Sequence, residues 1–148
     1  MRKVILAIAS ILFAATTVLA RDPVRRPMTT DDALNMVLIK NVLMSPDGRQ
    51  VFFSKSELDW EENKRSEKHY MISTDGEEAI QFIGDAGGSE FQFSPDGKHL
   101  SFLRDVDGNE QIFWMRISGG EAVKLTDHTN SIISYEWSAD ASKIFFTA

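Results

Sequence analysis

The chain of 148 residues contains no cysteine. This absence excludes disulfide bonds, cysteine-ligated zinc or iron–sulfur clusters, a cysteine nucleophile and a lipid anchor on cysteine. Positive charge is also scarce, since 16 Lys and Arg residues stand against 22 Asp and Glu residues, for a net charge of −6. That balance argues against a nucleic-acid partner, because nucleic-acid binding needs a basic surface. What remains is an acidic chain of globular composition, with 43% apolar and 26% charged residues.

The long apolar run of the sequence lies at its N-terminus. Arg2 and Lys3 precede the 17 residues of Val4–Ala20, and small or medium-sized residues stand before Arg21 as at a cleavage site. This pattern predicts a secretory signal peptide over residues 1–20, export to the periplasm or the medium, and no stable membrane insertion after cleavage. An uncleaved membrane anchor is the alternative. Without Arg2 and Lys3 the chain carries 14 basic and 22 acidic residues, a net charge of −8.

A nine-residue segment recurs along the rest of the chain. SPDGRQVFF begins at Ser45, SPDGKHLSF begins at Ser94, and a divergent copy, SADASKIFF, begins at Ser138. The copies are 49 and 44 residues apart, a period typical of β-propeller blades. The sequence therefore predicts a repeated unit of several strands.

Each copy begins with a predicted turn between two strands. Proline sets φ at the second position of a type I turn, aspartate favours the third, and glycine accepts a positive φ at the fourth. The residues to which we assign this structural role are Ser45, Pro46, Asp47, Gly48, Ser94, Pro95, Asp96 and Gly97. The third copy lacks both the proline and the glycine, so a looser turn is expected there.

Alternating residues on both sides of the turns predict four strands per repeat. The predicted strands are Val42–Met44, Gln50–Lys55, His69–Ser73 and Ala79–Ile83, then Glu90–Phe93, His99–Leu103, Gln111–Ile117 and Ala122–Leu125, then Ile132–Trp137 and Lys143–Thr147. Several are apolar on both faces, as in sheets stacked face to face.

The predicted fold class is all-β: a partial β-propeller of about two and a half four-stranded antiparallel blades, preceded by the signal peptide and a short helix. Residues 21–41 form an extended lead-in with a helix over Thr30–Met36, capped by Thr29 or Thr30. The propeller covers residues 42–148, with blades at 42–84 and 90–126 and half a blade at 131–148.

Closed propellers need about four to eight blades, because radial packing covers both faces of each sheet. The half-blade is therefore expected to expose those of its apolar residues that face a missing neighbour, among Ile133, Tyr135, Trp137, Ile144 and Phe146. Burial of each contributes about 1.5–3 kcal/mol, and a whole domain has only about 5–15 kcal/mol of stability. We therefore expect the N-terminal piece of a longer protein that aggregates when isolated; a ring of several copies is the alternative.

Four stretches resemble a known family: MTTDDALNMVLIKNVLMSPDGRQVFF, DWEENKR, FQFSPDGKHLSFLRD and ISGGEAVKLTD. They resemble the start of the propeller in exported bacterial serine peptidases of the prolyl oligopeptidase family, in the acylaminoacyl-peptidase and dipeptidyl-peptidase-IV-like branch. The resemblance covers nearly all of residues 28–148. TolB-like periplasmic propellers, which also contain SPDG repeats, are the second choice. TolB proteins place a separate α/β domain before the propeller, and no such domain fits this sequence.

The resemblance implies that the chemistry of the parent protein lies in an α/β-hydrolase domain after the propeller. The G-x-S-x-G elbow of that domain does not occur in this sequence, so we assign no catalytic residue. The implied role of the propeller is to cover the active site and admit short peptides. The implied partners are the remaining blades and hydrolase domain of the same polypeptide and the peptide substrates. A TolB-like protein-binding module is the alternative function, and no cofactor is predicted.

Three groups of polar residues are candidates for functional sites. Glu61 and Glu62 resemble the paired glutamates that hold a substrate's amine in dipeptidyl peptidases, although that pair lies in a helical insertion; a solvated strand connection over Asp59–Arg65 is the alternative. The loop Asp105–Glu110 lacks the glycine and glutamate positions of a calcium loop, so a hairpin is favoured and no metal is predicted. The sequence spacing does not place a nucleophile and an acidic residue beside His69, His99 or His128. No catalytic role is therefore assigned to these histidines.

Overall fold

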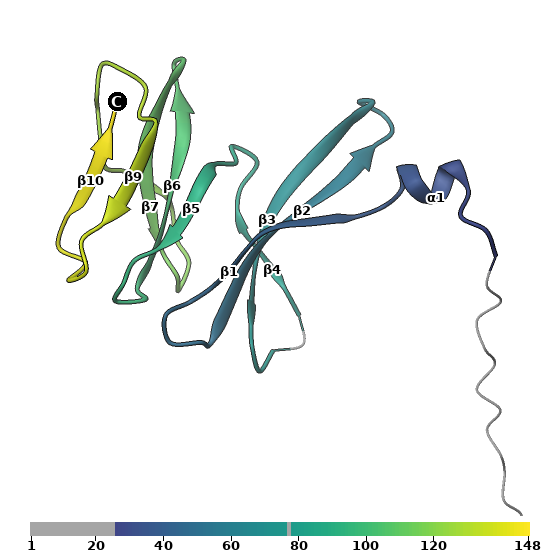
Figure 1. Cartoon of the computed structure of the whole chain (residues 1–148), viewed down its shortest axis with the longest axis horizontal. Coiled ribbons are helices and arrows are strands. Elements are labelled where there is room, and N and C mark those ends of the chain that lie inside the picture. Colours follow the sequence, from purple (N-terminus) through teal and green to yellow (C-terminus); the bar gives the residue numbers. More distant parts are fainter. Residues whose placement is uncertain (1–25, 77) are drawn as a thin grey trace, which may run out of the picture.

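The computed structural model describes residues 26–76 and 78–148, and the predicted signal peptide lies outside these residues. The described residues form one short helix and three antiparallel sheets (Figure 1). The elements are α1 (Thr30–Leu34); β1 (Leu38–Met44), β2 (Gln50–Asp59), β3 (Lys64–Ser73) and β4 (Ile80–Ile83); β5 (Ser89–Phe93), β6 (His99–Val106), β7 (Asn109–Arg116) and β8 (Val123–Lys124); and β9 (Ser134–Trp137) with β10 (Ile144–Thr147).

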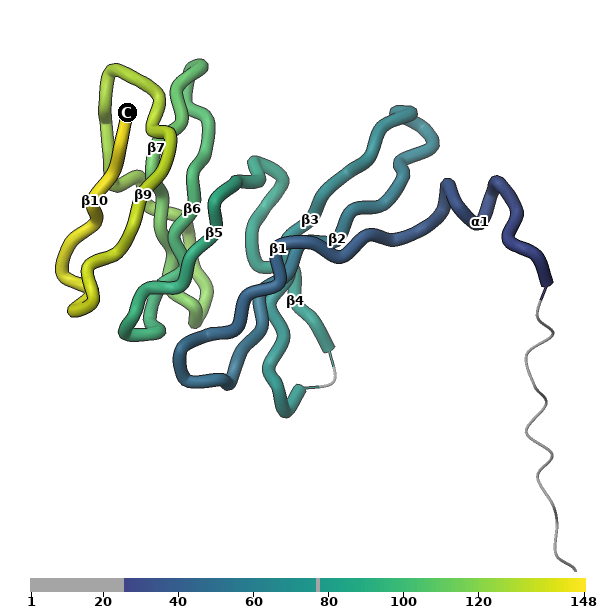
Figure 2. Tube along the Cα trace, viewed as in Figure 1, coloured from purple at the N-terminus to yellow at the C-terminus, as the bar shows by residue number. Residues whose placement is uncertain are grey.

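The two four-stranded sheets have the strand orders β1-β2-β3-β4 and β5-β6-β7-β8, and β9 with β10 forms a hairpin. The three sheets follow one another in a row, with the helix beyond the first sheet (Figures 1 and 2). Each sheet is a meander of strands that are consecutive in the sequence, which is the arrangement of a propeller blade. The predicted all-β fold class is confirmed.

The first sheet extends further than apolar alternation predicts. Strand β1 begins at Leu38 instead of Val42, and it contains a bulge at Asn41, which has a φ of 50°. The β2–β3 ladder continues to the Asp59–Lys64 pair, so the connection shrinks to residues 60–63. The added residues are mostly polar because this end of the hairpin projects away from the sheets (Figure 1), and alternation cannot reveal such a strand.

The third repeat turn is as tight as the other two, which corrects the expectation of a looser one. Its Ser138 N–H donates to the Lys143 carbonyl at 2.9 Å, and the Ser138 hydroxyl donates to Asp140 at 2.7 Å. The equivalent hydroxyl bonds, from Ser45 and from Ser94, are each 2.6 Å long. The serine and the aspartate therefore hold the turn without proline or glycine.

The aspartate of this turn is held in its charged form by the same contacts. In the third turn, the Ser138 hydroxyl, the backbone N–H of Ser142 and the Ser142 hydroxyl lower the pKa of Asp140 to about 2. In the second turn, the Ser94 hydroxyl and the Lys98 N–H likewise lower the pKa of Asp96 to about 2. An ionised aspartate, which can accept several hydrogen bonds, thus organises each turn.

Replacing Ala141 by glycine is expected to raise the free energy of unfolding by about 1 kcal/mol. Ala141 has a φ of 57°, where a Cβ atom is strained by about 1–2 kcal/mol and glycine is not. Urea unfolding followed by tryptophan fluorescence measures the difference. The matched control is Gly97→Ala at the same repeat position, where φ is 67°, and it should lower stability by a similar amount. Equal effects of the same sign would contradict this account.

Helix α1 is short and begins at a capping box. Thr29 is its N-cap, its hydroxyl accepts the Asp32 N–H, and the Asp32 carboxylate accepts the Thr29 N–H at 2.8 Å. Asp32 also pairs with Arg26, and this pair together with the Thr29 N–H and hydroxyl lowers the pKa of Asp32 far below its ordinary value. The helix ends at Leu34, two residues before the predicted Met36.

Two apolar cores lie between neighbouring sheets. The larger core joins the first and second sheets: Phe52, Met71, Phe82, Ile83, Phe91, Leu100, Phe102, Phe113 and Met115. The smaller core joins the second sheet to the β9–β10 hairpin: Leu103, Ile112, Ile132 and Tyr135, with Trp137 and Ile144 packed against them. Of the five half-blade residues considered for exposure to a missing neighbour, Tyr135, Trp137 and Ile144 contact the preceding blade instead. Ile133 and Phe146 are exposed as expected, and so is Phe145.

Candidate functional site

The tip of the β2–β3 hairpin holds Glu61 and Glu62, the substrate-binding candidates. Both backbone N–H groups donate to the Asp59 carboxylate, at 3.0 and 3.1 Å, and the Glu62 side chain lies 3.6 Å from the Lys64 amine. Both glutamates are exposed. The tip is fastened to the lead-in instead, because the Trp60 indole donates to the Asn35 side chain at 2.9 Å.

A polar pair is buried between the first and second sheets. The Ser54 hydroxyl lies 2.8 Å from Nδ1 of His69 and accepts a hydrogen bond from the Asn41 amide at 3.0 Å. The β1 bulge places Asn41 there, and the imidazole lies against the rings of Phe52 and Phe91. Because the Ser54 hydroxyl oxygen accepts from Asn41, we assign the hydroxyl as the donor in the hydrogen bond to Nδ1 of His69. The proton of the neutral imidazole then lies on Nε2. This direction is the one found when a histidine base activates a serine, but Ser54 is 0% exposed and His69 is 3% exposed, so the pair is enclosed in the core.

Stability is expected to fall below pH 6.5 because of His69. Burial lowers the pKa of this imidazole from its ordinary 6.5, so the unfolded chain takes up a proton that the folded chain resists. Stability is therefore complete above pH 6.5 and declines as the pH falls through that value. In His69→Gln, urea unfolding between pH 7.5 and 5 should depend less on pH. The control His99→Gln removes a less buried ring and should change the slope less; an unchanged slope in His69→Gln would contradict the argument.

Ser101 links the second sheet to the β9–β10 hairpin. Its buried hydroxyl accepts the Trp137 indole N–H at 2.8 Å and lies 3.0 Å from the Tyr135 hydroxyl. The Tyr135 hydroxyl also lies 2.6 Å from the Glu90 carbonyl oxygen. Burial raises the pKa of Tyr135 well above its ordinary value, so the phenol remains a donor at any physiological pH. These directed contacts fix how the two sheets are positioned.

Gln111 fixes the segment that crosses from the second sheet to the third. Its side-chain amide donates to the His128 carbonyl, and its oxygen accepts both the His128 N–H and the Thr126 hydroxyl, each at 2.9 Å. Thr126 in turn accepts the Ile112 N–H at 3.0 Å. Gln111 is buried, and all of its contacts are made inside the chain.

Arg104 holds the connection between the first and second sheets. Its guanidinium carbon lies 5.0 Å from the ring centres of Phe102 and Phe113, and its Nε donates to the Gly87 carbonyl at 3.2 Å. The neighbouring Gly88 packs so closely on Phe102 that an added Cβ would lie 2.7 Å from the ring. Partial burial lowers the pKa of the guanidinium, which still remains charged.

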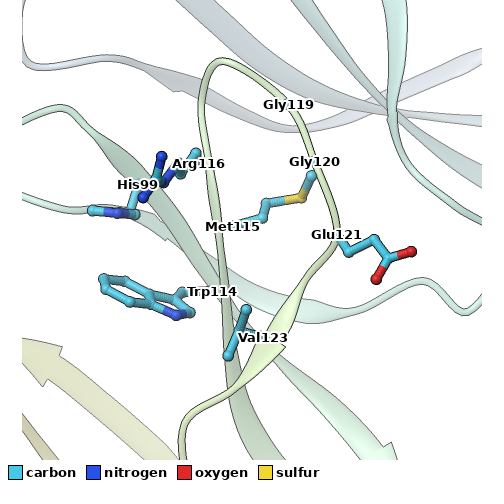
Figure 3. A pocket seen from close by; sticks show the side chains of 8 residues that line it. All are labelled: His99, Trp114, Met115, Arg116, Gly119, Gly120, Glu121 and Val123. Atoms are coloured by element: carbon cyan, nitrogen blue, oxygen red, sulfur yellow. The ribbon is translucent and has the colours of Figure 1, made fainter.

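A groove of about 450 Å³ lies on the second sheet between the ends of β6 and β7 and strand β8 (Figure 3). The His99 imidazole stacks on the Trp114 indole with 4.0 Å between ring centres, and Val123 pairs with Trp114 on the same face. The turn through Gly119 and Gly120 forms its rim. The groove is mostly apolar, and Trp114, which lines it, also lies against Trp137 of β9 with 6.4 Å between ring centres.

The described residues contain no cluster of three acidic or histidine side chains that could bind a metal. Asp107 and Gly108 form a two-residue hairpin turn with positive φ angles, and Gly108 N–H donates to Asp105 at 3.2 Å. No helix in residues 26–76 and 78–148 is long and apolar enough to span a membrane.

No family model matches the chain. The uncharacterized peptidase YuxL of Bacillus subtilis (strain 168) is 28% identical over 125 residues, which cover 83% of this chain and 19% of that protein. Dipeptidyl-peptidase 5 of Porphyromonas endodontalis is 27% identical over 125 residues, covering 82% of this chain and 18% of that protein. The chain resembles a peptidase propeller. It spans about a fifth of the length of these curated relatives.

Solved structures agree with this likeness at the level of the fold. The acylaminoacyl peptidase of Pyrococcus horikoshii has a TM-score of 0.61 at 21% identity, over 77% of this chain and 17% of that chain. A putative TolB from Agrobacterium tumefaciens has a TM-score of 0.53 at 22% identity, over 70% of this chain and 35% of that chain. The resemblance to prolyl oligopeptidase-family propellers, with TolB-like propellers second, is thereby confirmed.

The contacts that organise this peptidase-like propeller were mostly missed by sequence reasoning. Ser101 and Gln111 lie in strands where a polar residue among apolar ones was a visible signal. Arg104 stood within the matched stretch FQFSPDGKHLSFLRD but received no role. His69 was placed correctly in a strand, although nothing local predicted its bond to Ser54, which lies 15 residues away.

Proposed function

We propose that this chain is the first part of a β-propeller that covers the active site of a serine-type peptidase and restricts access to short peptides. The catalytic residues belong to a hydrolase domain later in the same polypeptide. The similarity to two peptidases about five times as long, over four fifths of this chain, supports the proposal. Neither the substrate nor the filtering role follows from that similarity alone, so both are part of the proposal.

The observation that carries the proposal is an uncovered apolar face at each end of the row of sheets. Phe52 and Phe145 hold the same position in the repeat; Phe52 is 0% exposed against the second sheet, whereas Phe145 is 62% exposed. A further sheet after the β9–β10 hairpin would cover Phe145 as the second sheet covers Phe52. Burial of such a ring stabilises by about 1.5–3 kcal/mol.

The first sheet, at the opposite end of the row, also has an outer aromatic face that is less buried than its counterpart in the second sheet. Phe53 and Tyr70 of the first sheet stack with 5.6 Å between ring centres, and Phe102 and Phe113 of the second sheet stack with 6.1 Å. Both pairs occupy equivalent positions, but only the second pair is buried, by the first sheet. A closed ring would place its last sheet against Phe53 and Tyr70. The chain is therefore suited to being an opening segment of a ring of sheets.

The proposal is tested on the product of the complete gene. We expect it to hydrolyse short chromogenic peptides and to leave intact folded proteins that contain the same peptide sequence. The present chain alone is expected to have no peptidase activity. Opening the propeller by deleting the β9–β10 segment should increase cleavage of longer polypeptides relative to short ones. Hydrolysis by the present chain alone, or an unchanged size preference in the deletion variant, would contradict it.

A TolB-like protein-binding module is the second candidate, and the fold likeness to a putative TolB supports it. That function requires further blades without a hydrolase domain. A serine-directed fluorophosphonate probe separates the two, because a single labelled serine in the complete gene product is expected only of a peptidase. A complete product that the probe does not label, and that retains a specific protein in the exported fraction, would favour the TolB-like function.

We also propose that residues 1–20 direct export, because of the basic start, the apolar run and the small residues before Arg21. Mass spectrometry of the protein from its native host should find a mature N-terminus at Arg21 in the periplasm or the medium. A cytoplasmic product that retains Met1 would contradict export.

A further inference from the structure

Four aspartates of this chain are followed directly by a glycine, and all four lie in turns between strands: Asp47, Asp75, Asp96 and Asp107. Glycine has no side chain, so it leaves its own backbone nitrogen unshielded. That nitrogen can attack the carboxyl carbon of the aspartate before it when the carboxyl group is protonated and the N–H proton has an acceptor. The surroundings of each nitrogen and each carboxyl group therefore decide which pair reacts.

Three of the four pairs are protected by hydrogen bonds within their turns. In the pairs of Asp47, Asp75 and Asp96, the glycine N–H donates to the backbone carbonyl three residues earlier, at 2.8 or 2.9 Å. A neutral carbonyl holds this N–H but does not take up its proton. The carboxylates of Asp47 and Asp96 also accept a serine hydroxyl at 2.6 Å and a backbone N–H at 3.1 Å. These contacts lower the pKa of both aspartates, and the ionised carboxylate resists attack.

The pair at Asp107, in the turn between β6 and β7, has different surroundings. The Gly108 N–H donates to the Asp105 carboxylate at 3.2 Å instead of to a backbone carbonyl. A carboxylate at this distance is within reach to act as a general base for that proton. The Asp107 side chain is exposed, and none of the hydrogen bonds among the described residues involves its carboxylate. The turn therefore combines an available carboxyl group with a nitrogen whose proton has an acceptor.

We propose that Asp107 is a site of spontaneous isoaspartate formation and that Asp105 accepts the proton in the first step. The Gly108 nitrogen bonds to the carboxyl carbon of Asp107 and gives its proton to Asp105. The bond from that carbon to the carboxyl hydroxyl group breaks, and the hydroxyl leaves as water with the proton that Asp105 returns. Water then opens the cyclic imide: attack at the backbone carbonyl carbon yields isoaspartate, and attack at the side-chain carbon restores aspartate. This modification is independent of the function proposed above.

Conversion of Asp107 would disturb the contact between the second sheet and the segment that follows β8. Val106 pairs with Asn109 across the turn, and isoaspartate adds one atom to the backbone between them. Glu110, the next residue of β7, donates its N–H to the Ser131 hydroxyl at 2.9 Å, and its carbonyl accepts the Ile132 N–H at 2.9 Å. Hydrogen exchange at Ile132 should therefore be faster after conversion than before it.

The test is a peptide map of the full chain after several weeks at mildly acidic pH in water enriched in heavy oxygen. Opening of the imide adds one solvent oxygen, so each passage through the imide marks the aspartate that reacted. We expect label and isoaspartate at Asp107 at least about tenfold above those at Asp47, Asp75 or Asp96. The same incubation in urea is the reference, since the unfolded chain should label all four at similar rates. Equal labelling of the four aspartates in the folded chain would overturn the proposal.

Three variants test the proton acceptor. Asp105→Asn removes the carboxylate and should slow labelling at Asp107 about tenfold, whereas Asp105→Glu keeps a carboxylate and should retain most of the rate. Asp59→Asn is the matched control and should leave the rate unchanged. Asp59 also accepts backbone N–H groups at a hairpin tip, at 3.0 and 3.1 Å, but no glycine follows it. Equal rates in the two Asp105 variants, or equal slowing by Asp59→Asn, would overturn the proposal.

Discussion

Replacing Phe102 by alanine is expected to lower the free energy of unfolding by about 3–5 kcal/mol, the range for large-to-small changes of buried aromatic residues. Phe102 contacts Phe113 of its own sheet, Phe91 of the neighbouring strand and the backbone of Gly88 in the connection between sheets. Alanine would leave a cavity where both complete sheets meet. It would also remove one of the two rings that hold the Arg104 guanidinium.

Phe146→Ala is the matched control, because Phe146 holds the same repeat position in β10 but is 42% exposed. Urea unfolding followed by tryptophan fluorescence should show a loss of no more than about 1 kcal/mol, since a half-exposed ring loses little buried area. Similar losses in the two variants would show that the first two sheets do not form the stable core described here.

Replacing Gln111 by leucine is expected to lower the free energy of unfolding by about 2–4 kcal/mol. Leucine matches the size of glutamine, but it leaves the His128 N–H, the His128 carbonyl and the Thr126 hydroxyl without their partner. These hydrogen bonds are partly buried, and each one that is lost without replacement by water costs about 1–3 kcal/mol. The crossing segment 126–131 should therefore detach first, which hydrogen exchange at these residues would detect.

Gln111→Glu separates the two kinds of contact at this residue. A glutamate carboxylate still accepts from the His128 N–H and the Thr126 hydroxyl, but it has no proton for the His128 carbonyl when ionised. At low pH, where the carboxyl group is protonated, we expect Gln111→Glu to lose less free energy of unfolding than Gln111→Leu. Near neutrality, where the carboxyl group is ionised, we expect the loss in Gln111→Glu to be larger than at low pH. Equal stability of Gln111→Leu and the native chain would contradict the proposed role.

The repeat, the strand order and the helix cap could be predicted from the sequence because each depends on local chemistry. The Thr29 and Asp32 capping box spans four residues, and the SPDG turns connect strands that are adjacent along the chain. The turn at Ser138 differs from the looser turn that the missing proline and glycine predict. Its retained serine and aspartate make the same hydrogen bond that is present in the other two turns.

Contacts between sheets could not be predicted in the same way, because they join residues far apart in the sequence. The Trp137 indole donates to the hydroxyl of Ser101, 36 residues earlier, and the Gln92 amide donates to the carbonyl of Tyr135, 43 residues later. These bonds position the half-blade against the second sheet, so Tyr135 and Trp137 are covered although the third sheet has two strands, β9 and β10, in the part of the chain that the structure describes. The hollow of about 310 Å³ beside β10 cannot be predicted from the sequence for the same reason, since the residues that line it, such as Ile112, Leu125 and Ile144, are separated along the chain.

The central proposal, that further strands complete the sheet begun by β9 and β10, is tested most directly by hydrogen exchange at β10. The measurement compares the amides of residues 144–147 in the present chain and in the complete gene product. We expect exchange in the complete product to be at least about a hundredfold slower, because an added strand would form backbone hydrogen bonds along the open edge. Equal protection in both forms would show that β10 needs no further strand and would contradict the account.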